Sequence, residues 1–206
     1  MVKPQPVVVV LAAGRGSRFE GDGHKLTQTL GSASVLSITL GHVVASGLPL
    51  VVVTTAALVA QVQAVVAARD IVLLPPVGSA TREPLGMGYS IAAGVGARSQ
   101  ASSWLIMPGD MPLVQPSTLR AVARALVQHP VAYAQHLGRR GHPVGFGSEL
   151  YSELVTLTGD EGARRLLARY PAHPVEIDDP GVLVDVDTEA DLALARKALA
   201  LVTGEM

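Results

Sequence analysis

The chain has 206 residues, of which 49% are hydrophobic and 16% are charged, a composition typical of a folded globular protein and not of a disordered one. The formal net charge is −1 and neither end of the sequence carries a run of like charges, so the composition offers no support for nucleic acid or another polyanion as a partner. The absence of cysteine excludes disulfides, thiolate metal ligands and a cysteine nucleophile.

Short apolar runs alternate with helical patterns through the first two thirds of the sequence. The runs are rich in Val and Ile, which is typical of strands buried on both faces of a parallel sheet, and they cover residues 7–13, 48–55, 70–76, 102–110 and 130–137. The spacers place apolar residues at helical intervals over residues 33–47, 56–69, 86–98 and 115–128. This alternation predicts an α/β fold with a mostly parallel sheet.

The sequence after residue 137 is less regular. We expect a turn leading into a short strand at 138–146, and helices near 148–157 and 160–169, capped by Ser148 and by Thr158 or Asp160. Strands at 174–179 and 182–186 follow, and Thr188 is a suitable cap for a last helix over 189–202. No repeat, low-complexity segment or linker divides the chain, so we predict a single domain over residues 1–206.

No membrane partner is expected. No run reaches the roughly 18 apolar residues that a membrane helix needs. The first residues, MVKPQPVVVV, lack the order of charged, apolar and small-residue segments that marks a signal peptide. The sequence therefore predicts a cytoplasmic protein.

The first predicted strand ends in the segment LAAGRGSR, residues 11–18. Ligands of open α/β sheets bind at the carboxyl ends of strands, glycine lets backbone amides approach an anion, and Arg15 and Arg18 add positive charge. Phe19 stands where the dinucleotide fingerprint needs a third glycine, and no Gly-Lys-Ser/Thr triplet of a Walker loop is present. The segment therefore predicts a phosphate site of another kind, with an ordinary strand-to-helix turn as the alternative.

Lys25 lies in the polar, glycine-rich stretch EGDGHKL. A flexible ammonium on such a loop suits phosphate oxygens, although a surface lysine is an equally good interpretation of this segment alone. Its neighbour His24 is interpreted as a solvated side chain.

Two aspartates follow predicted strands and are candidate metal ligands. Asp110 stands in MPGDMP directly after the apolar run WLIM, and Asp187 stands in DVDT with Asp185 two residues before it. Mg²⁺ prefers oxygen ligands and commonly takes one or two carboxylates together with substrate phosphates. The alternatives are that Asp110 caps a turn and that Asp187 and Thr188 merely begin the last helix.

In their order along the chain, LAAG-x-G-x-R, Lys25-Leu26, GDMP, GHPV, TGD-x-GAR and DVDT resemble the molybdenum cofactor cytidylyltransferases of the MobA-like nucleotidyltransferases, from about Val7 to Leu194. The resemblance implies a Rossmann-like, three-layer α/β/α fold. It also implies transfer of CMP from CTP to a molybdopterin-type molybdenum cofactor, with Mg²⁺ as cofactor and pyrophosphate as product. Residues to about 110 would bind the nucleotide, and residues from about 111 to 206 would bind the acceptor.

The resemblance also implies roles for single residues. Arg18, Lys25 and Asp110 would carry catalysis, with Asp110 and Asp187 on the metal. The nucleotide would lie on Leu11, Ala12, Ala13, Gly14, Arg15, Gly16, Lys25, Gly86 and Ser90. The acceptor would lie on His142, Gly159 and Asp160. An alanine in LAAG, where guanylyl-transferring relatives usually carry a second glycine, favours CTP over GTP.

The sequence contains no serine-histidine-aspartate order or other nucleophile signature, and this reaction needs none because the attacking phosphate is already anionic. Two alternatives stay open within enzymes: guanylyl transfer to the same pterin, and nucleotidyl transfer to a sugar or alditol phosphate. A third alternative is a non-catalytic carrier that hands the molybdenum cofactor to a recipient molybdoenzyme.

Overall fold

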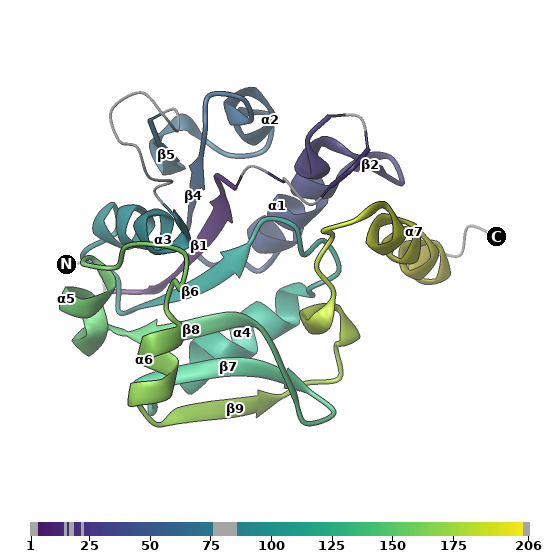
Figure 1. Ribbon diagram of the computed structural model, residues 1–206. Helices are drawn as coiled ribbons and strands as arrows, with labels where there is room; N and C mark the ends of the chain where they lie inside the picture. The colour runs from purple at the N-terminus through teal and green to yellow at the C-terminus, as the bar shows by residue number, and fades with distance from the viewer. Residues whose placement is uncertain (1–3, 15, 17–18, 22, 76–85, 204–206) are drawn as a thin grey trace.

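A computed structural model describes residues 4–14, 16, 19–21, 23–75 and 86–203. A seven-stranded sheet with helices on both faces runs through it in the order β5-β4-β1-β6-β8-β7-β9 (Figure 1). Only β8 runs against the other six strands. The strands are β1 Pro6–Ala12, β4 Leu50–Thr54, β5 Ile71–Leu73, β6 Ser103–Pro108, β7 Val131–His136, β8 Arg139–Gly147 and β9 Ala172–Glu176. The predicted α/β fold with a mostly parallel sheet is confirmed.

The Val-rich strands are buried on both faces, as their composition predicts. In β1, Val8 and Val10 belong to the apolar cluster on one face of the sheet, whereas Val7 and Val9 belong to the cluster on the other. Strand β6 divides in the same way, with Leu105 on the first face. Each face of these strands therefore contributes to a separate apolar cluster.

The helices form a layer on each face. Helices α1 (Val35–Ala45), α2 (Val59–Gln63), α4 (Pro116–Ala125) and α7 (Glu189–Thr203) pack apolar residues into the first cluster. Helices α3 (Gly86–Gly96), α5 (Tyr151–Leu154) and α6 (Arg164–Arg169) cover the second cluster. Short 3₁₀ turns complete the chain: η1 Lys25–Thr27, η2 Ala68–Asp70, η3 Ser148–Leu150 and η4 Pro180–Leu183. No helix within the described ranges is long and apolar enough to cross a membrane.

Several predicted details of the second half are wrong. The segment 182–186 is not a strand, because η4 begins at Pro180, where Asp179 caps it by accepting from Gly181 N. Ser148 does not cap its helix, since the N-cap there is Gly147. Neither Thr158 nor Asp160 caps α6, which begins only at Arg164 after Ala163, and no side chain donates or accepts at that cap.

The structure also contains a hairpin that the sequence pattern did not predict. Strands β2 (Thr29–Leu30) and β3 (Ala33–Ser34) pair antiparallel around a two-residue turn in which Gly31 has a φ of +63°. Arg196 of α7 donates to the Thr29 carbonyl at 2.8 Å, so the last helix lies against this hairpin (Figure 1). This contact brings α7 next to the segment that contains Lys25.

Candidate functional site

The carboxyl ends of β1 and β6 lie side by side and present Asp110. Leu11 pairs with Pro108 in the parallel register, and Gly109 N donates to the Leu11 carbonyl at 2.9 Å. A side chain at position 109 would place its Cβ 3.0 Å from that carbonyl oxygen, so glycine permits this approach. The strand-end rule therefore positions Asp110 beside the start of the glycine loop.

A second segment brings Asp187 to the same place. Val186 N donates to the backbone carbonyl of Asp110 at 2.9 Å, which joins the chain before α7 to the end of β6. The carboxylate of Asp191 accepts from Asp187 N at 3.2 Å, Thr188 N at 2.8 Å and Thr188 Oγ1 at 2.7 Å. Asp191 N donates back to Thr188 Oγ1 at 3.2 Å, so Thr188 caps α7 as predicted. Asp191 thereby holds the turn that presents Asp187.

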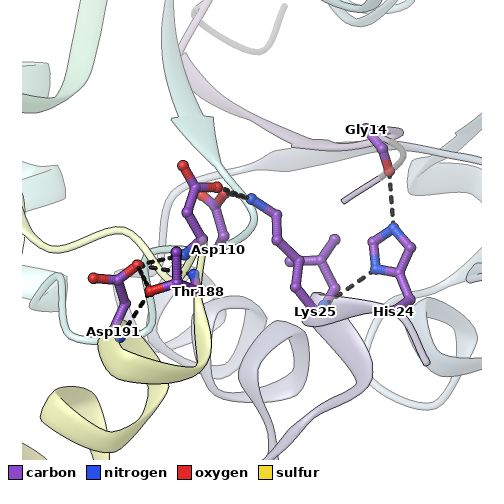
Figure 2. A network of polar contacts seen from close by, with 8 residues as sticks. Gly14, His24, Lys25, Asp110, Thr188 and Asp191 are labelled. Carbon is purple, nitrogen blue, oxygen red and sulfur yellow. Dashed lines mark hydrogen bonds and ion pairs between the residues drawn. The ribbon is translucent and has the colours of Figure 1, made fainter. Parts of the chain in front are cut away.

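Lys25 lies between the two candidate metal ligands, although they are far from it in sequence. Its Nζ lies 2.5 Å from Asp110 Oδ2 (Figure 2) and 2.5 Å from Asp187 Oδ1. The side chains of Lys25, Asp110 and Asp187 are only 12%, 16% and 12% exposed. Burial lowers the pKa of the Lys25 ammonium, but the two carboxylates outweigh burial and raise that pKa above its ordinary value. Lys25 is therefore a charged, buried group at the strand ends.

The donor set fits a divalent cation. Asp110 Oδ1 is buried and has no hydrogen-bond partner among the described residues. Desolvation raises the pKa of Asp185, and the negative charges of Asp187 and Asp110 add to the shift, so a third carboxylate lies close by. Among the described residues, three carboxylates against one ammonium leave an excess of negative charge. The described residues contain no group of three or more acidic or histidine side chains placed to hold a metal ion, so a cation on Asp110 and Asp187 would need water and phosphate to complete its shell.

His24 is not the solvated neighbour that the sequence predicts. Its Nδ1 accepts from Leu26 N at 3.1 Å and its Nε2 lies 2.9 Å from the Gly14 carbonyl oxygen (Figure 2). Since a carbonyl only accepts, Nε2 carries the proton and donates to Gly14. No feature of the sequence indicated this contact. Asp191 was also missed, but the pattern Thr188-x-x-Asp191 resembles a capping box and was available as a signal.

The glycine loop is described only in part. Leu11 and Ala12 end β1, Ala13 and Gly14 follow, and Gly16 has a φ of +64° and accepts from Phe19 N at 3.0 Å. Arg15 and Arg18, the two predicted cationic residues of the loop, lie outside the described residues. The nucleotide-binding roles of the loop stay predictions.

The residues predicted to read the base and some of those predicted to bind the acceptor meet at the start of α3. Gly88 N donates to the Gly159 carbonyl at 2.8 Å, and a Cβ on Gly86 would come within 2.3 Å of the Gly159 carbonyl carbon and 2.9 Å of Asp160 N. The Ser90 hydroxyl lies 3.5 Å from the Gly86 carbonyl within the helix. The two segments thus form one junction.

His142, predicted to bind the acceptor, lies on β8 near the end of β6. Burial lowers the pKa of its imidazole, the Asp110 carboxylate opposes this shift, and the Arg140 guanidinium adds to it. The ring is therefore neutral at pH 7 and offers one donor and one acceptor nitrogen. Within the described part of the chain, no hydrogen bond joins His142 to Gly159 or Asp160.

A mostly parallel sheet whose strand ends gather a glycine loop, a buried lysine and carboxylates has its polar site where open α/β sheets bind ligands. The sequence matches the family model described as "MobA-like NTP transferase domain" over residues 8–175. The chain belongs to this family and is a nucleotidyltransferase.

Known proteins agree with this membership. The chain is 33% identical over 120 residues to the purine catabolism protein PucB of Bacillus subtilis, a match that covers 56% of this chain and 58% of PucB, so it spans little more than half of that relative. The crystal structure of Rv0371c from Mycobacterium tuberculosis superimposes with a TM-score of 0.80 at 26% identity, over 96% of this chain and 100% of that one. A second structure of Rv0371c is a complex with manganese.

Molybdopterin-guanine dinucleotide biosynthesis protein A from Archaeoglobus fulgidus superimposes with a TM-score of 0.69 over 95% of this chain and 99% of that one. Its sequence identity of 16% supports the fold alone.

Proposed function

We propose that the chain transfers CMP from CTP to a molybdopterin-type molybdenum cofactor and releases pyrophosphate. The observation that carries this proposal is the position of Lys25 Nζ, 2.5 Å from a carboxylate oxygen of both Asp110 and Asp187. Displacement at an α-phosphorus needs little covalent help from the protein and much charge neutralisation and in-line positioning. A buried ammonium beside the glycine loop supplies positive charge where the triphosphate would lie.

Asp110 and Asp187 would hold the divalent cation, which we propose to be Mg²⁺. The unpartnered Oδ1 of Asp110 and the excess of negative charge support this assignment, as does the manganese complex of Rv0371c. When bound, the cation neutralises charge on the phosphate oxygens. Lys25 then donates hydrogen bonds to the departing pyrophosphate, because its ammonium has three donors. Arg18 is proposed to add a second positive charge.

The base and the acceptor are proposed to meet at the junction between α3 and the segment 158–160. Gly86 and Ser90 would face the base, and the alanine-containing LAAG segment supports CTP over GTP by its resemblance to the cytidylyltransferases. Gly159 and Asp160 would face the pterin. The neutral ring of His142 would donate to the terminal phosphate of the acceptor, which stays anionic and needs no general base. This assignment divides the chain near residue 110 into nucleotide-binding and acceptor-binding parts, and makes a cytoplasmic molybdoenzyme the recipient of the product.

Product analysis tests the proposal. The chain is incubated with Mg²⁺, isolated molybdenum cofactor and each of CTP, GTP, ATP and UTP, and pyrophosphate and the nucleotide adduct are measured. We expect the CMP adduct with CTP, no pyrophosphate from Asp110→Ala, and full activity from the control Asp178→Ala, which changes an exposed aspartate.

Three results would contradict the proposal. A GMP adduct, or CTP binding at least tenfold weaker than GTP, a gap of about 1.4 kcal/mol, would overturn the choice of base. A product formed only with sugar or alditol phosphates would overturn the acceptor. Undiminished delivery of the cofactor to a molybdoenzyme by Asp110→Ala would indicate a carrier.

A further inference from the structure

We infer that His24 is a positioning residue that sets the glycine loop and Lys25 in one fixed relation for the nucleotide. The inference rests on the proposed nucleotidyl transfer at this site, but not on which base or acceptor the site binds. His24 touches no reacting atom in this assignment. It acts through the two segments that its ring joins.

The imidazole connects the end of β1 to the start of η1. Its Nε2 donates to the Gly14 carbonyl at 2.9 Å, ten residues earlier in the sequence. Its Nδ1 accepts from Leu26 N at 3.1 Å and so caps η1, the turn that begins at Lys25. One side chain therefore fixes the backbone on both sides of Lys25 and ties it to Gly14.

Gly16 shows how closely the loop lies on this side chain. A Cβ at position 16 would lie 3.3 Å from Lys25 Cγ and 3.5 Å from His24 Nε2. The stem of Lys25 thus passes beneath the loop, and its ammonium continues to Asp110 and Asp187 at 2.5 Å each. A triphosphate that contacts both the loop amides and the ammonium needs this spacing to be preserved.

Loss of the hydrogen bond between His24 and Gly14 should weaken nucleotide binding and have little effect on the stability of the fold. Gly14 is exposed, and hydrogen bonds at exposed sites add little to global stability. Without the tether, the loop must be ordered against Lys25 each time a nucleotide binds, which weakens affinity. A general structural role would instead lower the melting temperature and kcat together with the affinity for the nucleotide.

Two substitutions separate the two bonds. His24→Asn places an amide oxygen near the position of Nδ1 and keeps the cap on Leu26 N, but it cannot reach Gly14. His24→Gln places an amide nitrogen near the position of Nε2 and keeps the donor to Gly14. His173→Asn is the matched control, because His173 lies exposed on β9 at the edge of the sheet and stacks only on His129.

The experiment measures KM for the preferred nucleoside triphosphate, kcat and melting temperature for the wild type and the three variants. We expect His24→Asn to raise KM by about fivefold to tenfold, the size of one lost hydrogen bond, with kcat within about twofold and an unchanged melting temperature. His24→Gln restores KM, and His173→Asn matches the wild type. A KM in His24→Asn equal to that of the wild type would overturn the inference. So would a rise in KM accompanied by a fall in kcat and in melting temperature in both His24 variants.

A ¹⁵N NMR measurement of the His24 ring tests the geometry without any enzyme assay. The wild type is expected to show the tautomer protonated at Nε2, with the signal assigned by its loss in His24→Asn. A ring protonated at Nδ1 would contradict the two hydrogen bonds. Failure of the proposed function would leave this signal unchanged, so the two outcomes are distinct.

Discussion

Replacing Lys25 by methionine removes the only positive charge between Asp110 and Asp187 among the described residues and keeps most of the apolar stem. The three side chains are 12–16% exposed, and the two charged contacts are 2.5 Å long. Removing one partner of a buried pair costs about 3–5 kcal/mol. Because some solvent reaches these groups, we expect the low end, about 3 kcal/mol. For a chain of this size that corresponds to a fall in melting temperature of about 6–12 °C.

The assay is thermal unfolding of the apo protein at pH 7 in EDTA and low salt, with Lys197→Met as the matched control. Lys197 lies exposed on α7, so its replacement is expected to shift the free energy of unfolding by no more than about 0.5 kcal/mol. A Lys25→Met variant as stable as the control would refute the reasoning, because the ammonium would then not bridge the carboxylates in solution.

The stabilisation that Lys25 contributes should fall at high pH. The carboxylates raise the pKa of Lys25 in the folded state above the value of about 10.4 in the unfolded chain, despite the opposing effect of burial. The stabilisation is therefore fully present below the unfolded pKa and is lost as pH rises through the folded pKa. The difference in stability between wild type and Lys25→Met should stay constant from neutral pH to about pH 10 and shrink above it.

Three further predictions concern the surroundings of the site. Asp179 is 4% exposed and its carboxylate accepts three hydrogen bonds, so Asp179→Ala should lower the free energy of unfolding by about 3 kcal/mol in denaturant titrations and leave kcat intact below the melting temperature. Gly86→Ala should lower the free energy of unfolding by about 2 kcal/mol and raise KM for the nucleotide, because the φ of Gly86 is +70° and the added Cβ would overlap Gly159. The control Gly96→Ala should leave the free energy of unfolding unchanged, because no atom lies within 4 Å of its added Cβ. Equal stabilities of the two variants would contradict this prediction. His142→Ala should raise KM for the acceptor about tenfold without changing the Kd of CTP, and a change in that Kd alone would place His142 on the nucleotide instead.

The sheet was predictable from sequence, whereas several local turns were not. Val-rich runs between helical patterns specify buried parallel strands, because both faces of each strand are apolar. The run VLVDV is also rich in Val but is not a strand. Its first two residues, Val182 and Leu183, end η4, because Gly181 lies against the Leu113 carbonyl and Asp179 caps the turn. The position of η4 depends on its contacts with α4 and β8, and these contacts join segments that are distant in sequence. The β2–β3 hairpin could have been found, because a Gly-Ser pair between two short apolar segments is typical of a two-residue turn.

The site was predictable where a strand end delivers the residue. Asp110 follows the end of β6 after a single glycine, and the strand-end rule alone placed it next to the glycine loop. For Asp187 the sequence left two interpretations, metal ligand and start of α7. The structure shows that Thr188 caps α7 and that Asp187 contacts Lys25, and metal binding by Asp187 stays a proposal. The contact between His24 and Gly14 was out of reach, because it depends on how the loop between them folds back. Arg15 and Arg18 themselves lie outside the described residues.

The proposed function requires that the glycine loop, Lys25 and the two aspartates act on one nucleoside triphosphate. A crystal structure of the chain with CTP and Mn²⁺, read by the anomalous signal of manganese, tests this most directly. We predict one manganese peak bonded to Asp110 and Asp187, with the triphosphate extending from it to Lys25 and the amides near Gly14 and Gly16. A nucleotide bound elsewhere on the protein, or a manganese peak away from Asp110, would contradict the account.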